Sequence, residues 1–242
     1  MSHLMNNYGR LPVSFDHGQG VWLWDKEGHK YLDALAGIGH AHPRLVRAIA
    51  DQASKLIHCS NYFNIDLQEK VAEKLVEHSG LEAVFFCNSG LEANECAIKI
   101  ARKFGHAKGI EVPNIIVLKH AFHGRSIATL SATGNPSVRE DFSPYTEGFI
   151  FVDESDLDGI RKIVEENKNV VAIFFEPILG EGGVVPIDLS VIKGIREICD
   201  EHDLLMMCDE VQCGMGRSGK WFAHQWAEIK PDVITMAKGL AG

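Results

Sequence analysis

The chain has 242 residues, of which 45% are hydrophobic and 24% are charged, and its formal net charge is -9 at pH 7. A chain of this length can form one large α/β domain, or a domain and a half, with an ample core. The composition is that of an ordinary globular protein. The acidic balance disfavours a general binder of nucleic acid or anionic membranes, and no apolar run reaches the roughly 18 residues of a membrane-spanning helix.

The six cysteines are neither dense nor regularly spaced; they lie at positions 59, 87, 96, 199, 208 and 213. Several fall in apolar runs, as reduced thiols of a protein core do. We therefore expect a cytoplasmic protein without structural disulfides, and we interpret Cys59, Cys87, Cys96 and Cys199 as core residues.

The N-terminal part of the chain predicts a hairpin followed by helices. Strand-like runs at 20–25 and 30–33 are separated by Lys26-Glu27-Gly28, which suits a turn between two strands. Helical patterns follow at 43–57 and 66–78.

From residue 83 onward, short apolar runs alternate with amphipathic stretches of helix length. Such alternation is typical of βαβ units, so we predict an α/β fold with a mostly parallel sheet and helices on both faces. One stretch places Val191, Ile192, Ile195 and Ile198 on a single stripe at helical spacing. The expected strands are 83–86, 115–118, 149–152, 170–175, 204–208 and 233–236, and the expected helices include 91–104 and 189–202.

We divide the chain near residue 60. Residues 1–60 are expected to contribute to a small domain, and residues 61–242 to form a large one. The chain stops at Gly242, directly after an apparent strand end. A domain rarely finishes there, so we expect the sequence to be incomplete at its C-terminus.

Three ionisable residues stand at the ends of predicted strands. Glu176, Asp209 and Lys238 each follow an apolar run, and ligands of open α/β sheets bind beyond the carboxyl ends of the strands. A lysine in this place is expected to be partly desolvated, which lowers its pKa and frees the amine to form a Schiff base. An aspartate there can keep a heteroaromatic nitrogen protonated. Taken singly, a solvated lysine and a capping aspartate are the commoner interpretations.

A further motif indicates an anion site. Ser89 precedes a predicted helix and Glu92 follows three residues later, which is the pattern of a capping box. The free N–H groups at such a helix start favour a phosphate, although the motif taken alone is more often that of an ordinary capped helix. Together, a phosphate anchor, an acid and a lysine are what pyridoxal phosphate needs.

Five motifs resemble those of class III aminotransferases in residue type, order and spacing, and the resemblance spans nearly the whole chain from about residue 8. They are Asn88-Ser89-Gly90-Leu91-Glu92-Ala93-Asn94-Glu95, Phe122-His123-Gly124-Arg125-Ser126, Glu176-Pro177-Ile178-Leu179-Gly180-Glu181-Gly182-Gly183, Asp209-Glu210-Val211-Gln212-Cys213-Gly214 and Lys238-Gly239. Within the class, residues 128–135 and 32–38 look most like acetylornithine aminotransferases.

The resemblance implies a fold-type I transferase that uses pyridoxal 5'-phosphate. It implies that Lys238 binds the cofactor covalently and moves the proton, that Asp209 pairs with the pyridine nitrogen, and that Gln212 contacts the ring's 3-oxygen. It also implies that Phe122 stacks on the ring. The phosphate donors implied are Ser89, Gly90 and Leu91.

For the substrate, the resemblance implies that Arg125 clamps the α-carboxylate, a task that suits its planar guanidinium. Glu181 resembles the gating acid of the class, which pairs with an arginine when the donor is bound through its far amine. Glu176 is expected to support the site residues without contacting the ligand. The implied reaction moves the δ-amine of N2-acetylornithine to 2-oxoglutarate and gives N-acetylglutamate 5-semialdehyde and glutamate, a step of arginine biosynthesis. The class works as a homodimer, so a homodimer is expected.

The sequence departs from the class in three ways. Residues 36–38 directly abut residues 39–43, where the class usually has a longer stretch, and Leu91 replaces a small residue or threonine. The part that normally follows Gly242, with the arginine that pairs with Glu181, is missing from the sequence.

Two other motifs are set aside. Residues 214–219 match G-x-G-x-x-G, but no clear helix period follows, as a dinucleotide site requires. Neither the pair Cys208 and Cys213 nor the pair His40 and His42 has partners at zinc-ligand spacing, so no metal site is expected.

Three alternatives stay open. The donor can be ornithine, succinylornithine, succinyldiaminopimelate or 4-aminobutyrate, because the motifs do not define the pocket for the acyl group. The chain can also be a cofactor-binding fragment without turnover. A nicotinamide enzyme is the third alternative.

Overall fold

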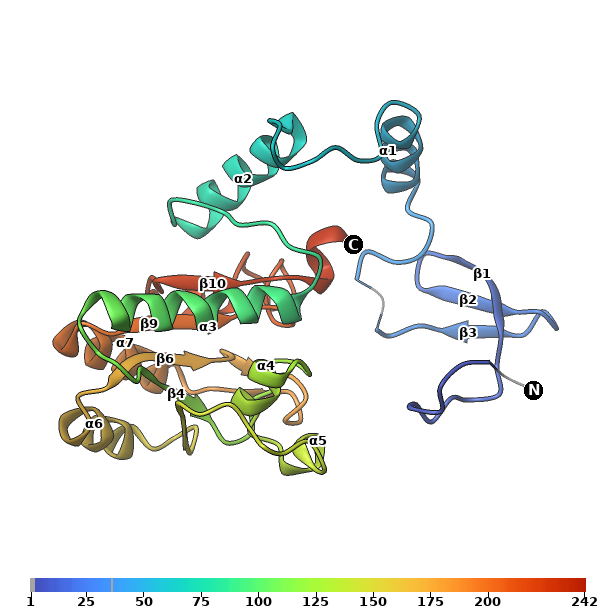
Figure 1. Cartoon of the computed structure of the whole chain (residues 1–242). Coiled ribbons are helices and arrows are strands. Elements are labelled where there is room, and N and C mark those ends of the chain that lie inside the picture. Colours follow the sequence, from blue (N-terminus) through green and yellow to red (C-terminus); the bar gives the residue numbers. More distant parts are fainter. Residues whose placement is uncertain (1–2, 36) are drawn as a thin grey trace. The chain divides into compact units, whose positions relative to one another are not determined.

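The computed structural model describes residues 3–35 and 37–242. These residues divide into two compact units, one that runs to Asn64 and includes Gly242, and one of Ile65–Ala241 (Figure 1). The functional division near residue 60 stays a prediction.

The first unit contains a three-stranded antiparallel sheet in the order β1-β2-β3, with β1 at Phe15–Gln19, β2 at Trp22–Asp25 and β3 at Lys30–Leu32. The predicted hairpin is confirmed, since β2 and β3 pair antiparallel. The carboxylate of Asp25 stabilises its turn by accepting hydrogen bonds from the backbone N–H groups of Glu27 and His29, at 3.1 and 2.8 Å. Helix α1, Pro43–Ala53, follows.

The second unit is built on a five-stranded sheet in the order β10-β9-β6-β4-β5, and every strand pair in it is parallel. This confirms the α/β class. Strand β6 is buried along its whole length because helices cover both faces. The strands are β4 (Asn114–Leu118), β5 (Phe149–Val152), β6 (Val170–Phe175), β9 (Leu205–Asp209) and β10 (Val233–Thr235).

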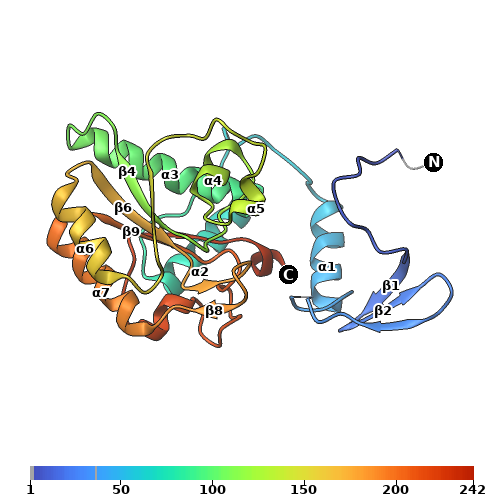
Figure 2. The ribbon, with the colours of Figure 1, turned by 90° about the horizontal axis from the view of Figure 1, so that it is seen from below.

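Helix α3, Gly90–Ala107, lies on one face of the sheet, and α6 and α7 lie on the other (Figure 1). Figure 2, seen from below, shows α6 (Leu157–Glu166) and α7 (Leu189–His202) side by side. The predicted stripe of α7 is confirmed, since Val191, Ile192, Ile195 and Ile198 are all buried. The other elements of this unit are α2 (Asp66–Ser79), α4 (Ile127–Ala132), α5 (Pro136–Arg139), β7 (Ile178–Leu179), β8 (Val185–Pro186) and the 3-10 helices η1 (Ala223–Ala227) and η2 (Lys238–Ala241).

One predicted strand is wrong. Residues 83–86 form no strand, and Phe85 is 70% exposed. An apolar run becomes a strand only where a neighbour satisfies its backbone groups, and no described strand pairs with this segment.

The core interpretation of the cysteines holds for Cys199, which is buried, but is wrong for Cys87, which is exposed; Cys59 and Cys96 are half-buried. All six are free thiols. Burial raises the pKa of the Cys199 thiol to about 12.

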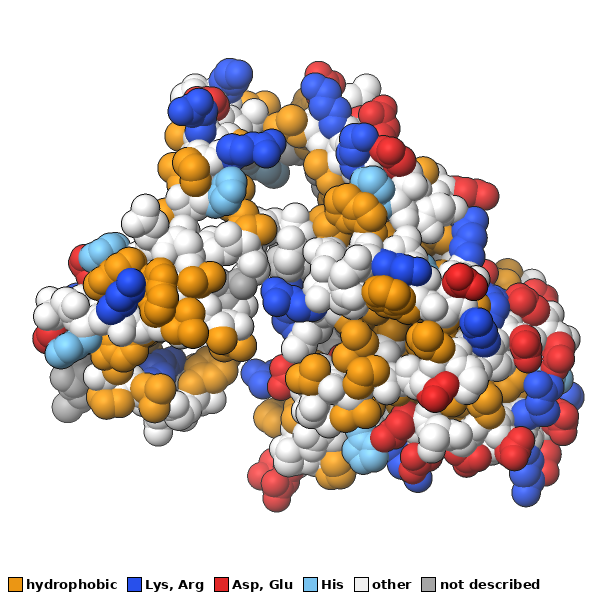
Figure 3. All heavy atoms as spheres, turned by 180° about the vertical axis from the view of Figure 1, so that it is seen from behind, with side chains coloured by type: hydrophobic (Ala, Val, Ile, Leu, Met, Phe, Trp, Pro, Cys, Tyr) orange, Lys and Arg blue, Asp and Glu red, His pale blue; other side chains and the backbone are white. Residues whose placement is uncertain are grey.

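On the face seen in Figure 3, acidic and basic side chains are interspersed and form no continuous basic stripe. Within the described residues, no helix has both the length and the apolar character needed to cross a membrane.

Candidate active site

The three ionisable residues predicted at strand ends lie at one edge of the sheet. Strand β9 pairs with β6 on one side and with β10 on the other, with Phe175 opposite Cys208 and Thr235 opposite Asp209. Glu176 and Asp209 are 4% and 2% exposed. Lys238 is exposed, so the desolvation expected for it from the sequence is wrong for this structure.

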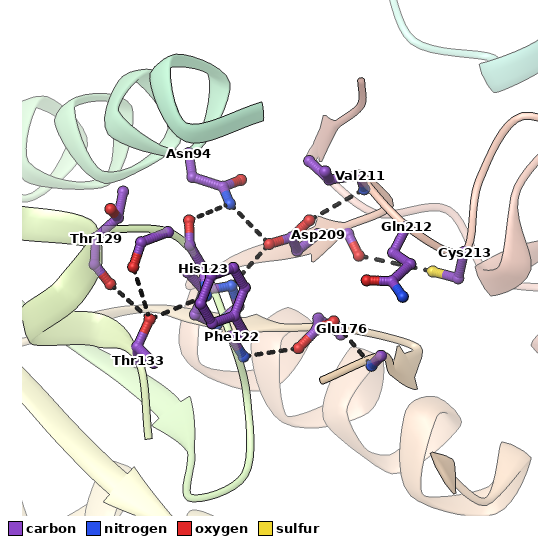
Figure 4. Close-up of polar contacts among 12 residues, drawn as sticks. Asn94, Phe122, His123, Thr129, Thr133, Glu176, Asp209, Val211, Gln212 and Cys213 are labelled. Atoms are coloured by element: carbon purple, nitrogen blue, oxygen red, sulfur yellow. Dashed lines mark hydrogen bonds and ion pairs between the residues drawn. The ribbon is translucent and has the colours of Figure 1, made fainter. Parts of the chain in front are cut away.

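Asp209 is held by three donors (Figure 4). One carboxylate oxygen accepts from the Asn94 side-chain amide at 2.7 Å and from the His123 ring Nδ1 at 2.8 Å. The other oxygen accepts from the backbone N–H of Val211 at 3.0 Å. A buried carboxylate needs such donors, and here they fix its orientation.

His123 is itself tightly placed. Its ring stacks on Phe174 at a centroid distance of 4.1 Å, and its backbone carbonyl accepts from the Asn94 amide at 2.7 Å. The ring Nε2 is buried without a partner among the described residues. Asn94 thus joins helix α3 to both His123 and Asp209.

Glu176 is satisfied in a different way, by backbone groups (Figure 4). Its two oxygens accept from the N–H of Phe122 at 2.8 Å and from the N–H of Gly180 at 3.1 Å. Burial, followed by the negative charge of Asp209, raises the pKa of Glu176 from 4.5 to about 7, although His123 and the two N–H groups oppose the shift.

The start of helix α3 lies against the same edge. The Ser89 side chain accepts from the N–H of Glu92 at 3.2 Å, as the capping motif predicts, whereas the Glu92 carboxylate accepts from the N–H of Asn88 at 2.6 Å. A Cβ on Gly90 would lie 2.7 Å from the Val211 side chain and 3.2 Å from that of Ala237. The helix therefore begins directly beside the segments that carry Asp209 and Lys238.

The first N–H groups of this helix, those of Gly90 and Leu91, have no acceptor among the described residues. Such groups, with the positive end of the helix dipole, bind anions. Because an N–H is a backbone group, the side chain at position 91 does not alter this capacity.

Lys238 begins η2 and has a φ of 41°, in the left-handed region that residues with a side chain rarely adopt. Its Nζ donates to the Gln212 side-chain oxygen at 2.8 Å. A cavity of about 850 Å³ reaches Lys238, Ala237 and Ser89 and extends along residues 81–88. Asp209, Phe122 and Gln212 do not line this cavity, so the geometry of the site depends on the hydrogen bonds above.

The remaining predicted residues are more exposed than Asp209 and Glu176. Phe122 is half-buried, and the Arg125 guanidinium carbon lies 5.7 Å from the centre of its ring. Arg125 and Glu181 are both exposed.

Asn94 and His123 stand within two of the five motifs, but no role was predicted for either of them. A signal for Asn94 was available, because it is a polar residue on the helix face that also buries Ala97, Ile98 and Ala101. A buried amide needs partners, which is a sign of a polar site beneath the helix. His123 has no comparable local signal.

A known protein family matches almost the whole chain. The family described as aminotransferase class III matches residues 4–242. The chain belongs to this family.

Among curated relatives, the chain is 53% identical over 245 residues to the acetylornithine aminotransferase of Nitrosomonas europaea, covering 99% of this chain and 62% of that protein. It is 49% identical to the acetylornithine aminotransferase of Synechocystis sp., covering 100% of this chain and 59% of that protein. The chain thus spans about 60% of the length of these relatives.

Solved structures give the same family. The ornithine aminotransferase of Toxoplasma gondii matches with a TM-score of 0.92 at 33% identity, over 98% of this chain and 57% of that one. The N-acetylornithine aminotransferase of Stenotrophomonas maltophilia matches with a TM-score of 0.81 at 38% identity, over 96% of this chain and 60% of that one. Another structure of the Toxoplasma gondii enzyme is described with partial occupancy of pyridoxal phosphate at its active site.

Proposed function

We propose that this protein binds pyridoxal 5'-phosphate and carries out transamination. One observation carries the proposal: a lysine amine, a buried carboxylate and a helix start with free N–H groups come together at one edge of a parallel sheet. The cofactor requires these three groups, for its aldehyde, its ring nitrogen and its phosphate. The uncapped N–H groups of Gly90 and Leu91 are the feature that fits its phosphate.

When bound, the cofactor supplies an electron sink that makes the substrate's C–H bond acidic. Around it, each residue of this chain has a proposed task. The Lys238 amine binds the cofactor and moves the proton, Asp209 holds the ring nitrogen protonated, and Gln212 orients the Lys238 amine or the ring's oxygen. Phe122 packs on the ring, and Ser89 with Gly90 and Leu91 positions the phosphate.

We propose N2-acetylornithine as the amino donor and 2-oxoglutarate as the acceptor, with N-acetylglutamate 5-semialdehyde and glutamate as products. The names of the relatives and their identities of about 50% support this donor. Arg125 is the proposed clamp on a substrate carboxylate, and its exposed guanidinium near Phe122 is compatible with that task. Glu181 is the proposed gating acid. Ornithine and the other donors of the class are the competing substrates.

We also propose that the protein works in the cytoplasm as a homodimer. Six free thiols and class membership support these two points.

The test is an absorption spectrum of the purified protein with pyridoxal phosphate, before and after borohydride, for the wild type, Lys238→Ala and Lys162→Ala. Lys162 is a matched control because its side chain is 72% exposed on α6. We expect a visible band that borohydride abolishes in the wild type and the control, and no such band in Lys238→Ala. A band of normal intensity in Lys238→Ala would contradict the role of this lysine.

The donor is tested by adding N2-acetylornithine, ornithine or 4-aminobutyrate in turn. Loss of the visible band with N2-acetylornithine at the lowest concentration is the expected result. A stronger response to ornithine would reassign the donor and leave the transaminase proposal intact.

A further inference from the structure

The two hydrogen bonds of Glu176 connect segments that are far apart in the sequence. Phe122 follows β4, and Gly180 follows β7, while Glu176 itself follows β6. One buried carboxylate therefore sets the distance between two loops at the carboxyl edge of the sheet. Because both donors are backbone N–H groups, the bonds fix the course of the chain itself and not merely a side chain.

Gly180 transmits this constraint to the lysine. A Cβ on Gly180 would lie 2.5 Å from Cδ of Gln212, so the Gln212 amide packs directly on the Gly180 backbone. The oxygen of the same amide accepts from the Lys238 Nζ at 2.8 Å. A displacement of Gly180 therefore moves the group that orients the lysine amine.

Phe122 is the other end of the connection. Its half-buried ring lies beside Arg125, and the next residue, His123, is hydrogen-bonded to Asp209. Fixing the Phe122 backbone therefore also fixes the approach of His123 to Asp209. The contacts run from Asp209 and Phe122, through Glu176, to Gly180, Gln212 and Lys238.

We propose that Glu176 is a positioning residue that holds the Phe122 loop and the Gly180 loop at the separation at which Lys238 and Asp209 act on one ligand. This proposal rests on the proposed function, because it names the residue that keeps the parts of that site at the required separation. The hydrogen bonds of Glu176 go to the backbone of Phe122 and Gly180, and that of the Lys238 amine goes to Gln212. Its charge matters as well as its length. The ionised carboxylate presents two acceptor oxygens to the two N–H groups, whereas protonation turns one of these oxygens into a donor.

The amide signals of the two loops provide a test that does not depend on activity. Leu179-Gly180 and Ala121-Phe122 each occur once in the sequence, so dipeptide-selective 13C/15N labelling identifies both amides by NMR. In the cofactor-free wild type we expect both signals to shift together as the pH passes about 7, with the titration of Glu176. Asp209 and His123 are the ionisable groups that act on the pKa of Glu176, so the titration of Glu176 is also followed through the His123 ring signal.

Two variants separate charge from reach. Glu176→Gln keeps the shape but replaces one acceptor by a donor, and Glu176→Asp keeps the charge but shortens the side chain. We expect the common titration of both amides to be abolished in Glu176→Gln, and at least one amide signal to be displaced in Glu176→Asp. Glu166→Gln is the control, since Glu166 is 69% exposed on α6. Unchanged amide signals in folded Glu176→Asp and Glu176→Gln overturn the proposal.

The second readout is the rate at which the borohydride-sensitive band forms after pyridoxal phosphate is added. We expect a rate about tenfold or more lower in both Glu176 variants, at equal folded fraction, because a misplaced group loses effective concentration. A purely structural carboxylate would lower stability and leave this rate per folded molecule unchanged, which would also overturn the proposal.

Two further outcomes have a defined interpretation. If the wild type forms no band, the proposed function fails, whereas the amide signals still decide the role of Glu176. If neither variant folds, hydrogen exchange in the wild type decides: slow exchange of the Gly180 and Phe122 amides supports the proposal, and exchange as fast as in an open loop overturns it.

Discussion

Two buried carboxylates stand at the carboxyl ends of neighbouring parallel strands in this protein, and each is satisfied by different donors. Asp209 receives side-chain donors from Asn94 and His123, and one backbone N–H. Glu176 receives backbone N–H groups alone. Burial disfavours the charged form of Glu176, and the negative charge of Asp209 adds to this effect, so the pKa of Glu176 is raised to about 7.

This difference predicts a pH dependence of stability. The folded pKa of Glu176, about 7, lies above its ordinary value of 4.5, so the folded state binds this proton more tightly than the unfolded state. The contribution of Glu176 to the free energy of unfolding is therefore greatest below about pH 4.5, falls as the pH rises to about 7, and stays low above that. The full change corresponds to about 3 kcal/mol.

The measurement is urea unfolding of the wild type and of Glu176→Gln between pH 4.5 and 8. The wild type is expected to lose stability relative to the variant across this range. Parallel curves for the two proteins would show that Glu176 does not titrate there. Glu166→Gln should run parallel to the wild type, because its side chain is exposed.

At the scale of elements, helix α3 combines two tasks. Its buried face packs on the sheet through Ala97, Ile98 and Ala101, while its first turn contributes free N–H groups and its second turn contributes Asn94 to the site. The close approach of its first residue to Val211 makes both tasks possible, because the helix start can lie against the loop only where no side chain intervenes.

Gly90→Ala tests this approach. In an open helix the alanine would be favourable, yet here its Cβ would lie 2.7 Å from Val211, so overpacking should destabilise the protein by about 1–3 kcal/mol. Denaturant unfolding and pyridoxal phosphate titration are the measurements, and both stability and affinity should fall. Gly9→Ala serves as the control, since nothing lies within 4 Å of its added Cβ. Equal effects of the two substitutions would show that α3 has room to move.

At the scale of the whole molecule, the two units differ in how much they bury. Among the described residues up to Asn64, only Asp25 is buried, whereas β4, β6 and β9 of the second unit consist almost entirely of buried residues. Local stability follows the density of buried apolar contacts. The first unit therefore has little core of its own.

Hydrogen exchange followed by mass spectrometry should resolve this contrast. We expect peptides from β4, β6 and β9 to exchange slowest and peptides from β1, β2 and β3 to exchange at least about a hundredfold faster. Similar protection in the two sets would mean that contacts outside the chain, such as a second copy, protect the first unit. Measurement across a range of protein concentrations distinguishes that case.

Much of the fold and part of the site follow from local features of the sequence. The apolar runs at 115–118, 149–152 and 170–175 and the stripe of α7 became the predicted elements, because burial and periodicity are properties of short segments. The order and spacing of the five motifs likewise placed the chain in its family, because each motif has its own local backbone requirement.

The tertiary structure decided the rest. Residues 83–86 match a strand in composition but lack a pairing neighbour, and pairing is a property of the sheet. Lys238 follows an apolar strand yet is exposed, because exposure depends on what packs around it. Asn94 and Asp209 are 115 positions apart, and only the packing of α3 on the sheet brings an amide and a carboxylate to 2.7 Å. Local sequence determines which groups are available; long-range packing determines which of them meet, because desolvation and hydrogen-bond geometry depend on neighbours that are distant in the chain.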